Sequence, residues 1–235
     1  NLTLEVHGNF YGAGGVGGTS SSLSGTDGGT ALSINSGRVT VDIQSNGRLW
    51  GGGGGGEFGA DGSPGSAGTC QKDTTVTACN TTPSCPPGQA LISQSQGGCC
   101  AFEQFCWGPW ESFCGNNCVG YTQVGTCRET TSSNPPAAVI GGNGGAGRGF
   151  NNFSGSLTGS AGASPNCPQC ASGFTLQSGT GSCGSQGGTG ATGGEWGQNG
   201  GNTAAAGSGG NGGNAISGSG FTVVGNNTNT VKGAI

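Results

Sequence analysis

The twelve cysteines are the chemically most informative residues of this chain, and their number and spacing predict disulfide bonds. Nine lie in residues 70–127 and three in residues 167–183. Both counts are odd, so complete pairing requires at least one disulfide between the two groups. The alternative is zinc bound by Cys167-Pro-Gln-Cys170 and the Cys114/Cys118 pair, but the single histidine and the irregular spacing favour disulfides, formed in an oxidising environment. The expected half-cystines are Cys70, Cys79, Cys85, Cys99, Cys100, Cys106, Cys114, Cys118, Cys127, Cys167, Cys170 and Cys183.

Side chains that could perform acid–base catalysis are few and scattered. His7, the only histidine, alternates with apolar residues and has no nucleophile near it in sequence, so we expect a solvated strand residue. Glu57 and Asp61 could suggest a glycosidase or a calcium site, but a spacing of four does not place them on one face of a helix with three residues per turn. Gly51–Gly56 lacks the following Lys-Ser/Thr of a phosphate loop. We expect no enzyme activity, no metal and no cofactor.

The segment FEQFCWGPWESF, residues 102–113, carries the densest group of aromatic side chains and is the best candidate for ligand contact. Trp and Tyr dominate binding surfaces because they bury a large area with few torsions. The alternative is that the rings form the core of this part of the chain, and for the phenylalanines a core role is favoured. Gly108-Pro109 is expected to present two tryptophans on a turn. The candidate contact residues are Trp107, Trp110, Phe105, Phe102, Tyr121, Glu103 and Glu111.

A glycine at every third residue is the pattern that must position these side chains. The step runs through GGGGGGEFGADGSPGSAG, residues 51–68, and recurs in residues 181–193 and 207–213. A period of three matches neither a half-buried strand nor an α-helix. It matches an extended helix of the polyproline-II type, in which one bare face lets neighbouring backbones approach closely. Collagen is excluded because the phase is repeatedly broken and only nine prolines are present.

Three stretches repeat one pattern of an alternating strand, a turn and an apolar step. The first is in residues 2–18, with a turn at Gly8-Asn9 and then a three-residue glycine step. The second is in residues 39–56, where Asn46-Gly47 is the strongest short hairpin signal. The third is in residues 221–235, and residues 19–37 are interpreted as a loop with a short apolar patch. Such repetition predicts strands that are stable only when stacked.

These patterns predict a mostly β and irregular fold with little or no α-helix. Short strands and a bundle of polyglycine-II-type helices carry disulfide-stapled, cysteine-rich insertions. Residues 1–68 form the first part of the glycine-rich scaffold and residues 69–134 a cysteine-rich inserted module. Residues 135–235 form the second part of the scaffold, with a small cysteine-containing insertion at 164–183 that is expected to pack against the first.

The composition supports an ordered chain of unusual type. Of 235 residues, 58 are glycine and only 7% are charged, against about 7% glycine and 25% charged residues in typical proteins. A net charge of −4 with six scattered basic residues argues against nucleic-acid binding. No apolar stretch is long enough for a transmembrane helix. Because the sequence starts at Asn1 and contains no methionine, we expect a processed product or a fragment.

Five glycine-rich stretches carry a resemblance to known proteins: Gly28–Leu32, Asn46–Trp50, Gly155–Gly162, Gly193–Gly197 and Gly209–Ile216. In these stretches the scaffold resembles the glycine-rich C-terminal region of phage tail-tip attachment proteins, the central tail fibres of lambda-like siphophages, and is related in style to the distal adhesins of T-even-like phages. The similarity covers residues 1–68 and 141–235, without 164–183. The cysteine-rich insertions depart from the family pattern, so the resemblance does not extend to the type of receptor.

The resemblance implies an adhesin at the distal tail tip of a virion, which binds a bacterial surface receptor during adsorption. The receptor is an outer-membrane protein, whose loops would accept the aromatic rings, or a surface glycan, on which the rings would stack. The resemblance also implies a homotrimer and contacts with other tail proteins. Two other functions stay open: a structural or surface-binding protein of the matrix or ice-binding type, and a depolymerase of surface polymers.

Overall fold

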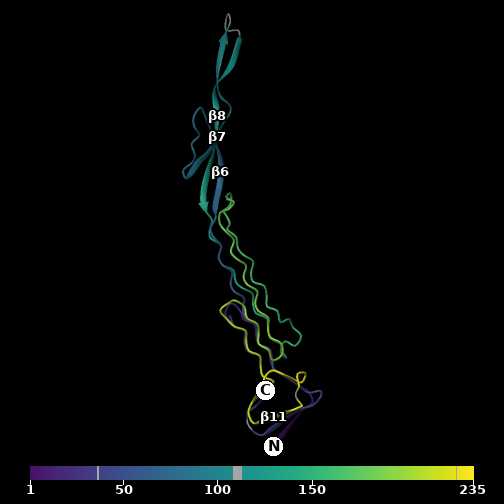
Figure 1. Cartoon of the computed structure of the whole chain (residues 1–235). Coiled ribbons are helices and arrows are strands. Elements are labelled where there is room, and N and C mark those ends of the chain that lie inside the picture. Colours follow the sequence, from purple (N-terminus) through teal and green to yellow (C-terminus); the bar gives the residue numbers. More distant parts are fainter. Residues whose placement is uncertain (36, 108–112, 226) are drawn as a thin grey trace. The chain divides into compact units, whose positions relative to one another are not determined.

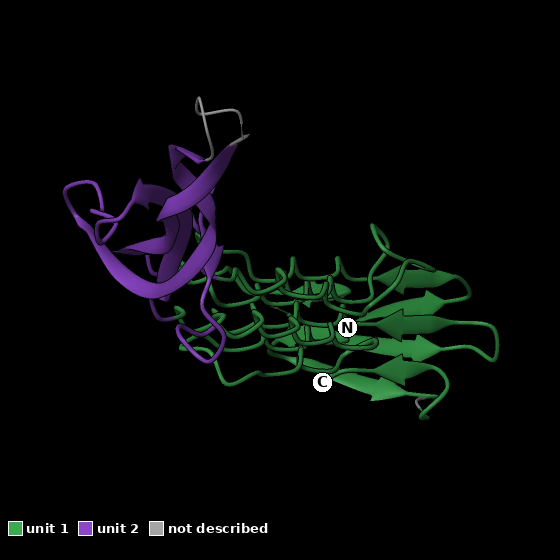
Figure 2. Ribbon diagram, turned by 90° about the horizontal axis from the view of Figure 1, so that it is seen from above, with its two compact units in different colours: residues 1–65, 136–167, 183–235 green, residues 66–135, 168–182 purple. Residues whose placement is uncertain are grey.

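The computed structural model describes residues 1–35, 37–107, 113–225 and 227–235, which form two compact units. Unit 1 consists of residues 1–65, 136–167 and 183–235, and unit 2 of residues 66–135 and 168–182 (Figure 2). Within the described residues the regular structure is all strand, with no α-helix, which confirms the predicted fold class at this level.

The described residues of unit 1 form eight short strands in three parallel sheets, of order β1-β4-β11, β12-β5-β2 and β10-β3. The strands are β1 (Leu2–Val6), β2 (Asn9–Tyr11), β3 (Leu32–Ile34), β4 (Val39–Ile43), β5 (Arg48–Trp50), β10 (Ile216–Gly218), β11 (Phe221–Val224) and β12 (Val231–Lys232). Each sheet of three strands takes one strand from each sequence repeat, in matching register. The repeats therefore stack on one another, as the pattern predicted.

The prediction of a β-hairpin at Asn46-Gly47 is wrong: the turn forms, but the strands on its two sides do not pair with each other. The Gly47 amide donates to the Gln44 carbonyl at 2.8 Å, which closes the turn. The flanking strands β4 and β5 nevertheless lie in different sheets, and each pairs in parallel with its equivalents in the other repeats. Each repeat buries its apolar residues by stacking on another copy rather than by folding back on itself.

The interpretation of residues 19–37 as a loop is also wrong. Leu32–Ile34 forms β3 and pairs with β10, a strand nearly two hundred residues further along the chain. The Gly25 and Gly28 amides donate to carbonyls in residues 208–211, so this stretch also joins the glycine segments. Neither partner is visible locally, because both pairings are set by distant parts of the chain.

The apolar core of unit 1 lies where the repeats stack. Val41, Leu49 and Ile216 come from the three different sheets, are at most 1% exposed and belong to one cluster, so inward positions of all three sheets meet there. The partly buried side chains of Val39, Phe221 and other strand residues surround this centre. The buried members are Val6, Ile34, Val41, Ile43, Leu49, Ala215 and Ile216.

Residues 51–65 form the central glycine segment of unit 1, where extended chain segments run side by side (Figure 1). Its backbone amides donate to different neighbouring segments in rotation. Every third amide from Gly53 to Gly65 donates to an antiparallel segment, residues 136–148, with N···O distances of 2.7–3.1 Å. The amides of Gly52, Gly55 and Phe58 donate to residues 23–29, at 2.9 Å in each case. The third set, at Gly51, Gly54 and Glu57, donates to carbonyls of Lys232, Gln198 and Gly201.

The carbonyls of the central segment accept hydrogen bonds with the same step of three. Residues 12–18 donate to it in parallel, and residues 185–197 donate to it from an antiparallel segment. Residues 51–59 are buried without interruption. A Cβ added at Gly54 would lie only 1.9 Å from the Gly210 carbonyl oxygen, so this close approach of backbones requires glycine.

The prediction that Gly181 belongs to the three-residue glycine pattern is wrong. Gly181 has φ of +72°, a left-handed conformation that the extended three-residue helix does not contain. It belongs to unit 2, and the regular step of its run begins at Gly184 in unit 1.

Unit 2 is an antiparallel sheet of order β7-β8-β6-β9. Its strands are β6 (Thr69–Cys79), β7 (Gln89–Trp107), β8 (Phe113–Ser132) and β9 (Thr175–Leu176). β6 pairs with β8 only from Thr69/Ser132 to Cys79/Thr122. Beyond Cys79, therefore, β7 and β8 continue as a pair of two strands. Residues 99–107 of β7 and 113–121 of β8 are here called the tip hairpin.

All twelve cysteines form disulfides, and the one between Cys70 and Cys170 joins the two cysteine groups, as their odd counts require. Five of the six lie in unit 2, and Cys167–Cys183 lies in unit 1. The other four are Cys79–Cys100, Cys85–Cys127, Cys99–Cys118 and Cys106–Cys114.

Candidate functional site

The tip hairpin exposes a stacked pair of aromatic rings. Phe105 and Trp107 lie two residues apart in β7, so strand alternation places both side chains on one face. Their ring centroids are 5.1 Å apart and nearly parallel, with an interplanar angle of 17°. The residues are 48% and 55% exposed. Glu103, also exposed, belongs to the same face by alternation, which provides a carboxylate next to the rings.

Phe102 belongs to the opposite face of the tip hairpin. No register shift separates it from Trp107, so alternation assigns it away from the stacked pair, and it is 63% exposed. The core role favoured for the phenylalanines is therefore wrong for Phe102 and Phe105. The physical reason is that β6 has ended at Cys79, so the two remaining strands have no further strand beside them to cover either ring.

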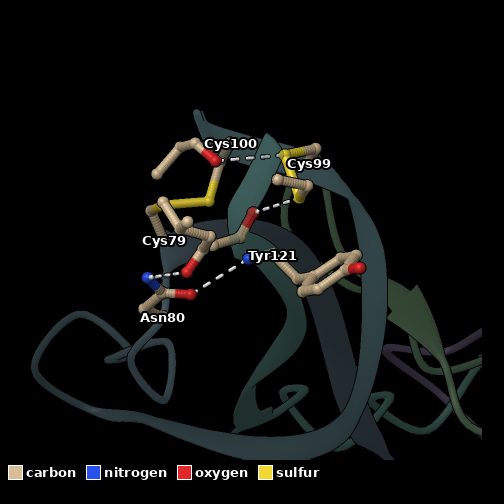
Figure 3. The surroundings of a disulfide bond; sticks show 9 residues. Cys79, Asn80, Cys99, Cys100 and Tyr121 are labelled. Carbon is tan, nitrogen blue, oxygen red and sulfur yellow. Dashed lines mark hydrogen bonds between the residues drawn. A yellow bond between two sulfur atoms is a disulfide. The ribbon is translucent and has the colours of Figure 1, made fainter. Parts of the chain in front are cut away.

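Two disulfides brace the base of the tip hairpin (Figure 3). The adjacent residues Cys99 and Cys100 of β7 bind different strands, Cys118 in β8 and Cys79 at the end of β6. Three strands are thus covalently joined at one level. The register also shifts on both sides of Cys99, and the disulfides hold the strands together where regular pairing is interrupted.

Asn80 completes this junction. It is the one non-glycine residue with positive φ (58°) in the described part of the chain. Its Oδ1 accepts the Tyr121 amide at 3.0 Å (Figure 3). The backbone amide of Asn80 in turn donates to the Tyr121 carbonyl at 3.2 Å. Asn80 thereby ends β6 and fixes the backbone of Tyr121, a candidate contact residue that is 47% exposed. Trp110 and Glu111, with the Gly108-Pro109 turn, lie outside the described residues.

Unit 1 contains a second aromatic cluster that sequence reasoning missed. Tyr11 and Trp50 are register partners in β2 and β5, and Trp196 packs against both, at centroid distances of 4.9 and 5.5 Å. The ammonium of Lys232, the register partner of Trp50 in β12, lies 4.3 Å from the Trp50 ring centroid. The repeated pattern contained the signal, because equivalent positions of stacked repeats become neighbours.

The remaining sequence candidates have structural partners. His7 is solvated, as predicted, and forms a hydrogen bond with Glu5 at 3.2 Å. Glu57 is completely buried, and its carboxylate accepts the amides of Thr203 and Gly207. Asp61 accepts the Gly141 amide at 2.9 Å. The two carboxylates thus bind backbone amides of different segments and do not form a catalytic pair.

Two ion pairs shift the pKa values of their carboxyl groups. The Arg128 guanidinium donates twice to Asp73, at 2.7 Å each, and this hydrogen bonding holds the pKa of Asp73 below its usual range. Arg148 donates to Glu195 at 3.1 Å and likewise lowers the pKa of Glu195. In the described part of the chain, no group of three or more His, Cys, Asp or Glu side chains is placed to hold a metal ion, and no helix has the length and hydrophobicity to cross a membrane.

A braced hairpin that exposes aromatic rings, carried by a chain whose scaffold is glycine-rich, has the organisation of a binding protein. Residues 1–103 match the family model described as phage tail fibre adhesin Gp38. Of the two kinds of phage protein that the glycine pattern resembles, the match supports the T-even distal adhesin type. No curated protein and no solved structure matches the chain.

The match defines the function at the level of a class. The protein is a phage tail fibre adhesin, a virion-associated, non-enzymatic protein that binds the host receptor during adsorption. The matched residues end at Glu103, inside β7. Phe105, Trp107 and Tyr121 lie beyond them, so the assignment of a contact surface rests on the structure of unit 2.

Proposed function

We propose that the face of the tip hairpin formed by Glu103, Phe105 and Trp107 is the main receptor-contact surface of this adhesin. The observation that supports it is the stacked, half-exposed pair of Phe105 and Trp107. Large rings at a binding surface contribute much of the affinity because their burial removes apolar area from water. Phe102, on the opposite face, and Tyr121, at the braced base, provide additional contacts. Trp110 and Glu111 are included in the proposal on the basis of the sequence alone.

The proposal includes a division of labour between the two units. Unit 1 is the scaffold, and we infer that its glycine segments are polyglycine-II helices. The rotation of donors around residues 51–65, one neighbour for every third amide, supports this, since a helix with three residues per turn presents three faces. Unit 2 is the inserted module that contacts the receptor, which is a protein or a glycan of the bacterial surface.

We also infer a homotrimer and attachment to other tail proteins. These inferences come from the resemblance to central tail fibres rather than from the fold, because unit 1 completes its buried core within one chain. Sedimentation equilibrium of the purified chain tests the assembly: we expect three times the chain mass of 22.4 kDa, and a mass of one chain would refute the trimer.

Alanine substitution tests the contact surface. We expect Phe105→Ala combined with Trp107→Ala to weaken binding of the purified chain to host cells by about 2 kcal/mol or more, roughly thirtyfold. Because both rings are half exposed, the melting temperature should hardly change. Trp107→Ala with Trp110→Ala should have a similar effect and should reduce the ability of the purified chain to block infection.

Ile92→Ala is the matched control, because Ile92 is an apolar β7 residue that is 45% exposed and far along the strand from the tip. This variant should bind as the unchanged chain does. Phe102→Ala shows whether the receptor also covers the opposite face. Full retention of cell binding by both double variants would refute the proposed surface.

A further inference from the structure

A polar hollow of about 440 Å³ lies at the other end of the unit 2 sheet from the tip hairpin. Small-ligand sites have volumes of about 300–1,000 Å³, so the hollow is of ligand size. It forms where β9 ends, because β9 pairs only with Cys70 and Gln71 and leaves the next residues of β6 without a neighbour on that side. Its polar walls are Gln71, Lys72 and Asp73 from β6, Arg128 from β8, and Thr175 and Gln177.

The walls of the hollow are held in place from both sides. The disulfide Cys70–Cys170 ties the chain segment of β9 to β6. The Gln177 amide donates to the Thr69 carbonyl at 2.8 Å, and the Gln71 side-chain amide donates to Gln177 Oε1 at 2.9 Å across the opening. A binding site fixed in this way loses little conformational freedom when a ligand enters.

The planar polar groups of the hollow keep hydrogen-bonding capacity for a ligand. Arg128 uses Nε and Nη2 for Asp73, which leaves its Nη1 amino group outside the ion pair. The bond between Gln71 and Gln177 leaves Gln71 Oε1 and Gln177 Nε2 for other partners. Both donors and acceptors are therefore available in the lining, which suits the hydroxyl groups of a sugar. Leu176 is the only large apolar side chain of the lining, so a peptide with apolar anchors would find little to bind.

The charge of the hollow is opposite to that of the whole chain. Unit 2 contains two basic residues, Lys72 and Arg128, and both line the hollow together with a single acidic residue, Asp73. The chain as a whole has a net charge of −4. The Lys72 ammonium lies 5.8 Å from the ring centroid of Phe174, which stands between the lining residues Gly173 and Thr175, and forms a cation–π contact with that ring. Arg128 is neutralised by Asp73, so Lys72 remains as the cation for a negatively charged group.

We propose that this hollow is a second binding site of the adhesin, which takes an acidic saccharide, a sugar ring that carries a carboxylate. The glutamine amides and Arg128 bind the ring hydroxyls, and Lys72 pairs with the carboxylate. This site is separate from the tip hairpin, so its failure in an experiment leaves the proposed receptor surface intact. Trp107 substitutions should not change saccharide binding, and Lys72 substitutions should not change contacts at the tip.

Titration calorimetry with two matched oligosaccharides tests the proposal. The probes are trigalacturonic acid and its fully methyl-esterified form, which has the same rings without charge, and the full chain is used. We expect the acid to bind about fivefold or more tightly than the ester, and this preference should shrink as salt is raised. Lys72→Gln should remove the preference, because it removes the charge while keeping a polar, hydrogen-bonding side chain only one atom shorter. Arg38→Gln, which removes one charge from unit 1, should leave it unchanged.

Each other outcome overturns the proposal. Equal binding of acid and ester refutes the charged subsite, and an unchanged preference in Lys72→Gln refutes the role of the hollow. Failure of the acid to bind at millimolar concentration refutes saccharide recognition. If Arg38→Gln loses the preference as strongly as Lys72→Gln, the effect comes from net charge and not from this site.

Discussion

The two units lack a large apolar core for the same reason, a sequence poor in apolar residues, but they achieve order by different means. Unit 1 buries ten apolar residues and packs glycine backbones against one another. Among the described residues of unit 2, the buried apolar residues are two half-cystines, Cys70 and Cys127, and two prolines, Pro83 and Pro168. Five disulfides therefore take the place of a core there.

The difference shows how structure and surface can be separated within one adhesin. In unit 1 each of the residues 51–56, and also Gly59 and Gly62, is restricted to glycine, because an added Cβ would lie within about 2.2 Å of a neighbouring carbonyl oxygen. In unit 2 the crosslinks hold the strands, so the other side chains are not needed for burial. Phe102, Phe105 and Trp107 can therefore face solvent without loss of the fold.

Reduction of the disulfides should have the largest effect, because it should unfold unit 2 and leave unit 1 folded. Loss of a native disulfide from a small domain costs about 2–5 kcal/mol, and unit 2 has little apolar burial to compensate. After complete reduction we expect the amides of β6, β7 and β8 to lose protection from hydrogen exchange, while those of residues 51–62 stay protected. Hydrogen-exchange mass spectrometry measures both units in one sample. Protected β7 and β8 amides in the fully reduced, alkylated chain would show that unit 2 does not depend on its disulfides.

The next largest effect is expected from one methyl group in the glycine bundle. Gly54→Ala would place a Cβ 1.9 Å from the Gly210 carbonyl oxygen, so two hydrogen-bonded segments must separate. We expect a loss of about 3 kcal/mol in the stability of unit 1, at the upper end for overpacked cores. The measurement is the thermal unfolding of the chain.

Gly8→Ala is the control for this substitution, because no atom lies within 4 Å of its added Cβ. Its stability should change by less than about 1 kcal/mol. If both variants unfold at the same temperature as the unchanged chain, glycine at every third residue does not serve close packing.

Sequence reasoning succeeded where the pattern itself is the physical cause. The three-residue step of glycine requires backbone approach, and the threefold repeat of strand, turn and apolar step requires stacking. The odd cysteine counts required a bridge between the groups, now seen as Cys70–Cys170. Each of these follows from spacing along the chain alone.

Sequence reasoning failed where the partner is remote. The pairing of β3 with β10 and the parallel partners of β5 depend on segments far along the chain, so local signals suggested a loop and a hairpin. The exposure of Phe105 follows from the point at which β6 ends, which the sequence did not indicate. The polar hollow combines β6, β8 and residues after the glycine scaffold resumes, so no single stretch contains its pattern.

A smaller loss of stability is expected when the buried Glu57 carboxylate of unit 1 is changed instead of a glycine. The Glu57 carboxylate accepts two backbone amides, and its side chain is completely buried. Glu57→Gln keeps the shape but turns one acceptor into a donor that faces an N–H group. We expect a loss of about 2 kcal/mol, the cost of a buried unsatisfied polar group. Asp27→Asn is the control, since Asn keeps the Oδ1 that accepts the Asn211 amide, and equal losses in both variants would contradict the assignment.

The smallest expected effect is a loss of stability at low pH. Each unit contains one ion pair between an arginine and a carboxylate, so the two units can be compared. The pKa values of Asp73 and Glu195 are lowered by hydrogen bonds from Arg128 and Arg148. A lowered pKa stabilises the fold above the pKa of the unfolded chain, about 3.9 for Asp and 4.3 for Glu, and this contribution is lost as pH falls through the folded value. Because both pairs are partly exposed, the loss should be small in each unit, and Asp73→Asn or Glu195→Gln should remove it.

Hydrogen exchange at pH 6 and pH 3 measures the two units separately. Since disulfides do not titrate, acid unfolding of unit 2 with its disulfides intact, but not of its Asp73→Asn variant, would show that the sheet depends on the Asp73–Arg128 pair more than on the crosslinks.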